Sequence, residues 1–191
     1  MEDAARWRLE AVRPLLSAYA ETAGVDAVIV GGSTARGDAD RWSDVEVGVF
    51  WERSPTTEER RSVPAAADVR LVNQGPPWND QLHLGTKAGL MVEVEHNLTS
   101  SVERTLDSVL TEHSTDGTAL GLVQGIVDGR EIAGVRADVV RRWQARAAAY
   151  PRGLAVAVVE YNGAIEKFWR LTMLAERENP LLVAREKPAR K

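Results

Sequence analysis

Hydrophobic positions in the first half of the chain alternate between helix-like and strand-like spacing. An apolar residue at every third or fourth position predicts an amphipathic helix over residues 5–22, whose apolar face would hold Trp7, Leu9, Val12, Leu16 and Tyr19. Short, mostly apolar runs that end at glycine or polar residues predict strands at 25–30, 44–51, 69–73 and 90–98. The charged stretch at 56–67 is predicted to be a solvated helix or loop.

From Thr99 onward the pattern changes, and every apolar stripe has helical spacing. The four stripes lie at 102–110, 120–127, 140–150 and 154–168. Mixed helices and strands followed by helices alone predict an α+β fold class, with a small mixed sheet flanked by helices in residues 1–98 and a helical bundle in residues 99–191. The last stripe stops without a packed finish, so we expect the helical domain to be truncated at its C-terminus.

Two acids interrupt the strand predicted at 44–51. Alternate side chains of a strand face the same way, so Asp44 and Glu46 share one face, while the valines beside them share the other. Two carboxylates placed in this way repel each other and lose hydration when partly buried, and a divalent cation offsets both costs. Ligands that are all carboxylate oxygens suit Mg²⁺ or Mn²⁺. For the pair taken alone, a solvated edge strand is the alternative interpretation.

The segment Gly31-Gly32-Ser33 lies between the strand predicted at 25–30 and the two acids. Glycines allow the backbone to approach a ligand closely, and the backbone amides that open a helix favour a phosphate group. Ser33 or Thr34 is also a candidate N-cap for a short helix after the turn. A phosphate-binding turn beside a metal-binding pair of carboxylates is typical of phosphoryl or nucleotidyl transfer.

The spacing of this turn and the acids resembles a known signature. Gly31-Gly32-Ser33, ten intervening residues and Asp44-Val45-Glu46 are similar to the motif of the DNA polymerase β-like nucleotidyltransferase superfamily, in the wording of its small-molecule branch, which includes the aminoglycoside and lincosamide nucleotidyltransferases. The resemblance implies a nucleotidyltransferase fold in residues 1–98, with Mg²⁺ or Mn²⁺ held by the two acids. It also implies that a nucleoside monophosphate, AMP when ATP is the donor, moves from a nucleoside triphosphate bound at Gly31, Gly32 and Ser33 to a hydroxyl of a small molecule. Antibiotics are among the acceptors that this branch suggests.

A third acid completes the site in that superfamily, and the strand predicted at 90–98 offers two candidates. Glu93 and Glu95 share one face of it. The resemblance favours Glu93 as a metal ligand or a base for the acceptor hydroxyl, because similar proteins carry the catalytic acid first in such a stretch; Glu95 is the alternative. Arg36 is a candidate contact for the triphosphate, and a surface ion pair with Asp38 or Asp40 is its alternative role.

Three further residues near these motifs have weaker functional interpretations. Trp42 is a candidate contact for a base or sugar, although packing is the commoner role of tryptophan. His96 is expected to make a structural hydrogen bond. Lys87 is expected to be a solvated lysine, with a phosphate contact as the alternative.

Charge and composition narrow the possible partners. The 191 residues include 24 Lys and Arg against 28 Asp and Glu, a net charge of −4, which argues against a nucleic-acid partner and suits a cationic acceptor. The absence of cysteine excludes disulfides and thiolate chemistry. The sequence has neither a signal-type N-terminus nor an apolar run long enough to span a membrane, so we expect a cytoplasmic protein without a membrane partner.

Two alternatives from other functional classes stay open. One is a toxin–antitoxin-type nucleotidyltransferase that modifies a protein or a tRNA, and the other is a non-catalytic nucleotide-binding relative. The complete glycine-serine turn and the three available acids argue against the second. Because similar enzymes build active sites from two subunits, a homodimer is also among the expectations.

Overall fold

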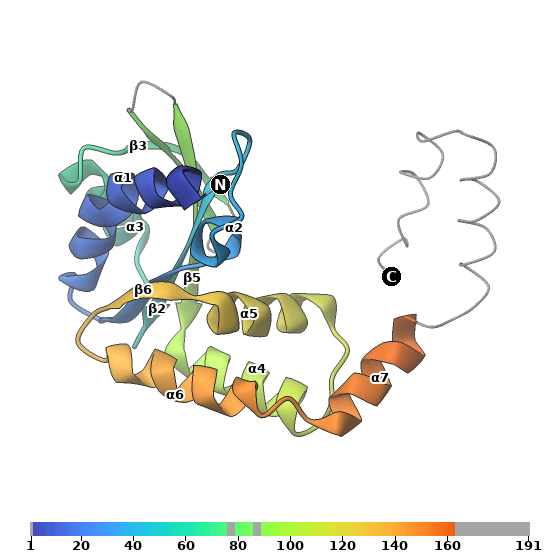
Figure 1. The fold of residues 1–191 in the computed structure, drawn as a ribbon. Coiled ribbons are helices and arrows are strands. Elements are labelled where there is room, and N and C mark those ends of the chain that lie inside the picture. The colour runs from blue at the N-terminus through green and yellow to red at the C-terminus, as the bar shows by residue number, and fades with distance from the viewer. Residues whose placement is uncertain (1, 76–78, 86–88, 163–191) are drawn as a thin grey trace.

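The structure is a computed structural model that describes residues 2–75, 79–85 and 89–162. Its strands form one mixed sheet in the order β3-β4-β5-β2-β1-β6 (Figure 1). The strands are β1 (Val25–Val30), β2 (Val45–Trp51), β3 (Arg70–Gly75), β4 (Asn79–Leu84), β5 (Leu90–Leu98) and β6 (Arg130–Ala133). The helices are α1 (Glu2–Ala20), α2 (Gly32–Arg36), α3 (Thr57–Ala66), α4 (Thr99–Leu110), α5 (Gly117–Asp128), α6 (Ala137–Ala148) and α7 (Arg152–Asn162).

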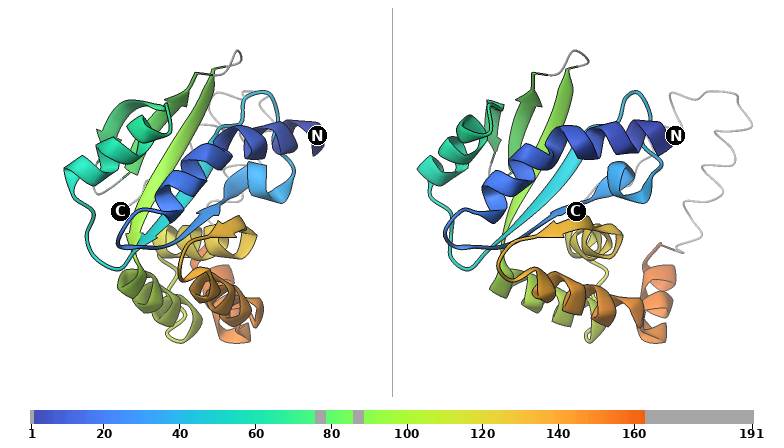
Figure 2. Two further views of the ribbon diagram at one scale, coloured as in Figure 1. Left: turned by 90° about the vertical axis from the view of Figure 1, so that its left-hand side faces the viewer. Right: turned by 60° about the vertical axis from the view of Figure 1, so that its left-hand side comes forward.

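Helices α1 and α3 cover one face of the sheet (Figure 2). The alternate valines of β2 and β5 point toward these helices and pack against the apolar face of α1. This arrangement follows from the period of two in each strand, which places all the valines of a strand on one side. The buried cluster contains Val12, Leu15, Leu16, Tyr19, Val45, Val47, Val49, Val92 and Val94.

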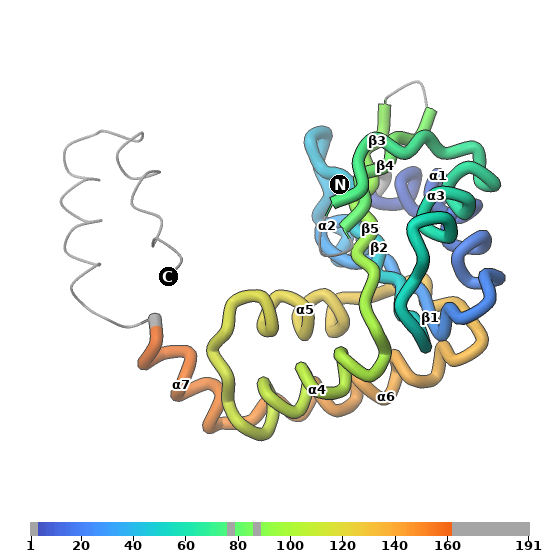
Figure 3. The backbone as a smooth tube through the Cα atoms, turned by 180° about the vertical axis from the view of Figure 1, so that it is seen from behind, coloured from blue at the N-terminus to red at the C-terminus, as the bar shows by residue number. Residues whose placement is uncertain are grey.

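Helices α4, α5 and α6 pack against the opposite face (Figures 1 and 3). Their apolar stripes meet Ala27, Ile29 and Phe50 of the sheet, and Phe50 contacts Trp143 of α6 edge-on at 5.1 Å between ring centroids. Helix α7 follows at the end of this layer that lies away from the sheet (Figure 3). The helices after β5 therefore share a core with the sheet.

The central pair of strands sets the geometry of the acids. Strands β2 and β5 run parallel, and their register places Glu46 beside Glu93 and Gly48 beside Glu95. The other strand pairs of the described sheet are antiparallel. The acids of both strands consequently lie on the face covered by α4 and α5, opposite the valines.

Most of the elements expected from the sequence are confirmed. The strands at 25–30 and 90–98 have the predicted bounds, the strand at 44–51 begins one residue later, and the third strand is shifted to Arg70–Gly75. Helix α1 continues through Pro14, and the charged stretch at 56–67 contains helix α3, which opens with a capping box between Thr56 and Glu59. The fold class is α+β, as predicted.

The prediction that the chain is helical throughout after residue 99 is wrong at β6. This strand has four residues and pairs antiparallel with β1 at the edge of the sheet. It is too short to show a period of two, so the sequence pattern gave no sign of it. The division into domains at 98/99 stays a prediction. Lys87, the last apolar stripe beyond residue 162 and the expected truncated end of the helical domain lie outside the described residues.

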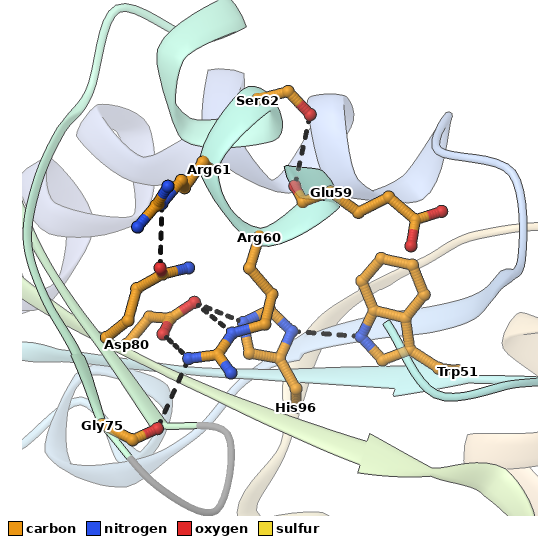
Figure 4. Close-up of polar contacts among 9 residues, drawn as sticks. Trp51, Glu59, Arg60, Arg61, Ser62, Gly75, Asp80 and His96 are labelled. Atoms are coloured by element: carbon orange, nitrogen blue, oxygen red, sulfur yellow. Dashed lines mark hydrogen bonds and ion pairs between the residues drawn. The ribbon is translucent and has the colours of Figure 1, made fainter. Parts of the chain in front are cut away.

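Strand β4 was also missed, because a buried acid occupies one of its inward positions. Asp80 is fully buried, and its carboxylate accepts a hydrogen bond from the guanidinium of Arg60 on α3 (Figure 4). It also accepts a hydrogen bond from Nε2 of His96, at 3.0 Å from Oδ2 of Asp80. The indole N–H of Trp51 donates to Nδ1 of the same imidazole at 3.1 Å. Because Trp51 can only donate, Nδ1 accepts and Nε2 carries the proton. His96 thus makes the structural hydrogen bonds that were predicted for it.

No helix among residues 2–75, 79–85 and 89–162 combines the length and the apolar character needed to cross a membrane.

Candidate active site

The turn after β1 is built around the carboxylate of Glu46. The amide of Gly31 donates to the carbonyl of Glu46 at 2.8 Å, which joins the end of β1 to β2. Gly32 has a φ of +60°, and a β-carbon on it would lie 2.5 Å from Cδ and Oε1 of Glu46. Any other residue at Gly32 would be strained and would displace the carboxylate. The turn and the acid therefore depend on each other.

Helix α2 opens at this turn without a side-chain cap. Its N-cap is Gly31, so the expectation that Ser33 or Thr34 caps the helix is wrong. Thr34 instead donates its hydroxyl to the carbonyl of Asp44 at 3.2 Å. By helix geometry the first amides of α2 have no partner within the helix, which leaves those of Gly32 and Ser33 available to a ligand. The hydrogen bonds from Gly31 to Glu46 and from Thr34 to Asp44 tie the turn to the start of β2, and the carboxylate of Glu46 lies next to Gly32.

The carboxylate of Glu46 lies in a field of negative charge. Partial burial against the turn raises its pKa above the ordinary value, and the charge of Asp44 raises it further. The charges of Glu95 and Glu93 act in the same direction, while Arg36 opposes them. Asp44 itself lies half-exposed, just before β2. The site is therefore arranged so that a bound cation would relieve a repulsion that already exists.

Glu46, Glu93 and Glu95 line a single pocket of about 570 Å³ between the sheet and helices α4 and α5. Glu93 lies beside Glu46 in the parallel register, and the side-chain amide of Gln81 on β4 donates to Oε1 of Glu93 at 3.4 Å. Glu95 is more exposed and lies next to Gly48. Of the two candidates for a third acid, Glu93 has the position nearer to Glu46 along the strand.

The remaining wall of the pocket is mainly apolar. Ile29 and Phe50 form the sheet side and Leu122 and Ile126 of α5 the helix side. Among the described residues that line the pocket, every Asp, Glu, Lys, Arg or His is an acid, since Asp116 joins the three glutamates and no cationic side chain is present. A volume of this size is typical of small-molecule sites.

The donor set fits a hard divalent cation held by few protein ligands. Asp44, Glu46 and Glu93 offer oxygen alone, the donor that Mg²⁺ and Mn²⁺ prefer. In the part of the chain that the structure describes, no three His, Cys, Asp or Glu side chains converge closely enough to hold an ion by themselves. Mg²⁺ in proteins is usually held by one or two carboxylates and completed by water and phosphate oxygens, and Asp44, Glu46 and Glu93 are the residues that would supply them.

Arg36 is paired with acids on both sides of the turn. Its guanidinium contacts Asp38 at 3.3 Å and Asp128 of α5 at 3.2 Å, and these bonds raise its pKa, with Asp128 the larger cause. The ion pair with Asp38 was one of the alternatives for Arg36, whereas the link to Asp128 was not predicted. Through this link α5 is tied to the helix that opens at the turn.

Arg8 is a residue of the site region that sequence reasoning missed. It is buried, and its guanidinium donates to the carbonyls of Ala4, Asp40 and Ser43 at 2.8, 2.6 and 3.0 Å. Two of these carbonyls belong to the loop that leads into Asp44. An arginine on the apolar face of a predicted helix was the available signal. Trp42 in the same loop is 79% exposed, contacts Arg41 and does not line the pocket.

The chain has a distant structural likeness to a known protein. No family model matches the chain, and no curated protein matches it. Among solved structures, a cytoplasmic RNA terminal U-transferase is similar with a TM-score of 0.41 and 12% sequence identity, over 66% of this chain. The match spans 38% of the length of the U-transferase chain. A likeness at this distance carries no argument about function, which must rest on the residues of the site.

Proposed function

We propose that the protein is a metal-dependent nucleotidyltransferase that moves a nucleoside monophosphate to a hydroxyl of a small molecule. The observation that supports this most directly is the position of Glu46. Its carboxylate lies next to Gly32 at the opening of α2; Asp44 is two residues away in the sequence, and Glu93 is its register partner on the parallel strand. A turn with free amides and a set of clustered carboxylates are the two parts that nucleotidyl transfer requires.

In the proposed reaction the acceptor oxygen attacks the α-phosphorus of a nucleoside triphosphate. The new bond joins that oxygen to the α-phosphorus, the bond from the α-phosphorus to the bridging oxygen breaks, and pyrophosphate leaves with the bonding electrons. A Mg²⁺ held by Asp44 and Glu46 would neutralise charge on the phosphates. The amides of Gly32 and Ser33 would bind the β- and γ-phosphates, and Glu93 would accept the hydroxyl proton or bind the metal.

The charge of the pocket supports a cationic acceptor. Its four charged residues, Glu46, Glu93, Glu95 and Asp116, are all acids. With Glu46 engaged by the metal and Glu93 by the metal or the hydroxyl proton, Glu95 and Asp116 are left to attract amino groups of the acceptor. A small molecule that carries both hydroxyl and amino groups therefore fits the proposed site better than an anionic one.

The proposal is tested by calorimetric titration of the protein with ATP and with GTP, each with and without Mg²⁺. We expect binding that depends on Mg²⁺ and is lost in Asp44→Asn, because the neutral amide holds the cation poorly. Transfer is then measured as pyrophosphate release with amino-bearing polyols as acceptors. Glu52→Gln, an exposed acid just after β2, is the matched control and should bind as the wild type does.

Two results would contradict the proposal. If the folded protein binds neither of these nucleotides, nor CTP or UTP, with Mg²⁺, the chain is not a nucleotidyltransferase. If Asp44→Asn binds and transfers as well as the wild type, the assignment of the carboxylates is wrong. Circular dichroism of each variant distinguishes these results from loss of the fold.

A further inference from the structure

Helix α5 carries three glycines at a spacing of four residues, and two of them line the active-site pocket. Gly121 and Gly125 face the pocket, whereas Gly117 at the start of the helix does not. Glycine is among the least favourable residues inside a helix, so each interior glycine has a cost that needs a reason. The usual reasons are a positive φ or a close neighbour.

Neither reason applies to these two positions. Gly121 and Gly125 have helical backbone, and a β-carbon on either would meet no described atom within 4 Å beyond the helix's own backbone and chain neighbours. Gly129, just after the same helix, shows the contrast, because its β-carbon would lie 2.9 Å from Cδ1 of Ile29. Gly129 therefore has a close packing neighbour, while Gly121 and Gly125 border the pocket.

The position of Gly125 relates this space to the proposed nucleotide. A β-carbon on Gly31 would lie 3.9 Å from the carbonyl oxygen of Gly125, so the backbone of α5 passes close to the phosphate-binding turn. The described lining of the pocket has no cation to hold phosphates, whereas Ile29, Phe50, Leu122 and Ile126 provide an apolar surface. A nucleoside that extends from phosphates at the turn therefore meets apolar side chains on one side and bare helix backbone on the other.

From this arrangement we infer that Gly121 and Gly125 keep the pocket wide enough for a purine and so determine which nucleoside triphosphate the protein accepts. This rests on the proposed nucleotidyl transfer at the same site. One helical turn separates the two glycines, about 6 Å along the axis. A bare stretch of that length accommodates a two-ring base, while a one-ring base needs less of it.

The test compares the binding of ATP and of CTP, each with Mg²⁺, to the wild type, Gly121→Ala, Gly125→Ala and the control Gly117→Ala. Each added methyl group at a lining position should weaken ATP binding about tenfold, because it would occupy space that the proposed purine fills and overpacking costs roughly that much. CTP binding should change less than about twofold. The melting temperature of Gly121→Ala and Gly125→Ala should rise by about 2–4 °C, since alanine favours the helix. Gly117→Ala should bind both nucleotides as the wild type does.

Greater stability together with weaker ATP binding is a result that a purely structural role of these glycines does not produce. The inference is overturned if the wild type binds ATP and both Gly121→Ala and Gly125→Ala bind ATP as tightly as the wild type does. It is also overturned if ATP and CTP are weakened to the same extent, because ring size would then have no part. A wild type that binds none of ATP, GTP, CTP and UTP would instead overturn the proposed function and this inference with it. The larger substitution Gly125→Leu should extend the loss of ATP binding beyond that of Gly125→Ala.

Discussion

Asp80 and Glu46 lie two strands apart on opposite faces of the same sheet. Asp80 is fully buried, yet each of its oxygens accepts a hydrogen bond from a donor that can carry positive charge or a proton, Arg60 or His96. Glu46 keeps contact with solvent, yet three of the four charged groups that act on its pKa, Asp44, Glu93 and Glu95, are acids. The buried acid Asp80 has hydrogen-bond partners for both oxygens, whereas the accessible acid Glu46 is repelled by its acidic neighbours.

The pKa values of the two groups record this difference. Burial alone would raise the pKa of Asp80, but the hydrogen bonds from His96 and Arg60 outweigh it, and the pKa lies below the ordinary value. For Glu46, burial and the charge of Asp44 both raise the pKa. One face of the sheet therefore uses an acid to hold the fold together, and the other keeps acids at a cost to the fold. Such a cost is common where a residue is retained for binding or catalysis.

The largest expected effect is the loss of the buried network in Asp80→Asn. Removing the charge leaves the guanidinium of Arg60 in a mostly buried position without its counter-ion, so we expect a loss of about 3–5 kcal/mol in the free energy of unfolding. Urea denaturation measures it. Asp138→Asn, which breaks an exposed pair with Arg142, is the control and should cost less than about 1 kcal/mol. Equal losses in the two variants would contradict the structural role of the network.

The next effect separates activity from stability at Glu46. Glu46→Gln should lower nucleotidyl transfer at least about 100-fold, since a ligand of the proposed cation is lost. The same change should raise the free energy of unfolding, by roughly 0.2–1 kcal/mol, because like charges in register across two strands repel. Activity assays and urea denaturation of one preparation give both numbers. A variant that loses stability, or that keeps its transfer activity, would show that Glu46 is a structural acid like Asp80.

Arg8 connects the two sides of the comparison, because it belongs to the helix on the Asp80 face and holds the loop before Asp44. Arg8→Met keeps the length of the buried side chain but removes three hydrogen bonds, so we expect a loss of about 2 kcal/mol in stability. Transfer measured well below the melting temperature should fall about tenfold, as the acid is held less firmly. Arg13→Met on the exposed side of the same helix is the control. If the activity of Arg8→Met is unchanged per folded molecule, the loop does not position Asp44.

The sequence pattern predicts the acids on the face covered by α4 and α5 more clearly than the buried acid on the face covered by α1 and α3. Glu46 and Glu93 alternate with valines, so the rule that acids point away from the core predicts the face of the sheet on which they line the pocket. Asp80 violates that rule, because Arg60 and His96 come from elements that only the fold brings together. For this reason β4 was not predicted, although β5 beside it had the predicted bounds.

Parts of the site were beyond pattern reasoning for a similar reason. The apolar pattern assigns no role to Gly121 and Gly125, and only the fold shows that they line the same pocket as the acids. The link from Arg36 to Asp128 joins residues 92 positions apart. Local periodicity indicates which face of an element is apolar, but it does not indicate which elements meet.

The smallest expected effect is a difference in pH dependence between the two acids. The folded-state pKa of Glu46 lies above its ordinary value of 4.5, so its ionised form destabilises the fold above the raised pKa, and this penalty vanishes as pH falls toward 4.5. The folded-state pKa of Asp80 lies below its ordinary value of 3.8, so the stability that its ionised form contributes is present above pH 3.8 and is lost only as pH falls through the lowered pKa.

Between pH 7 and pH 4.5 the two substitutions should therefore behave differently. The stability gained in Glu46→Gln should shrink toward zero, whereas most of the loss in Asp80→Asn should persist. Urea denaturation of both variants and the wild type at four pH values across this window measures the difference. A gain in Glu46→Gln that is independent of pH would mean that repulsion among the acids does not cause it, and the contrast between the two faces would then rest on packing alone.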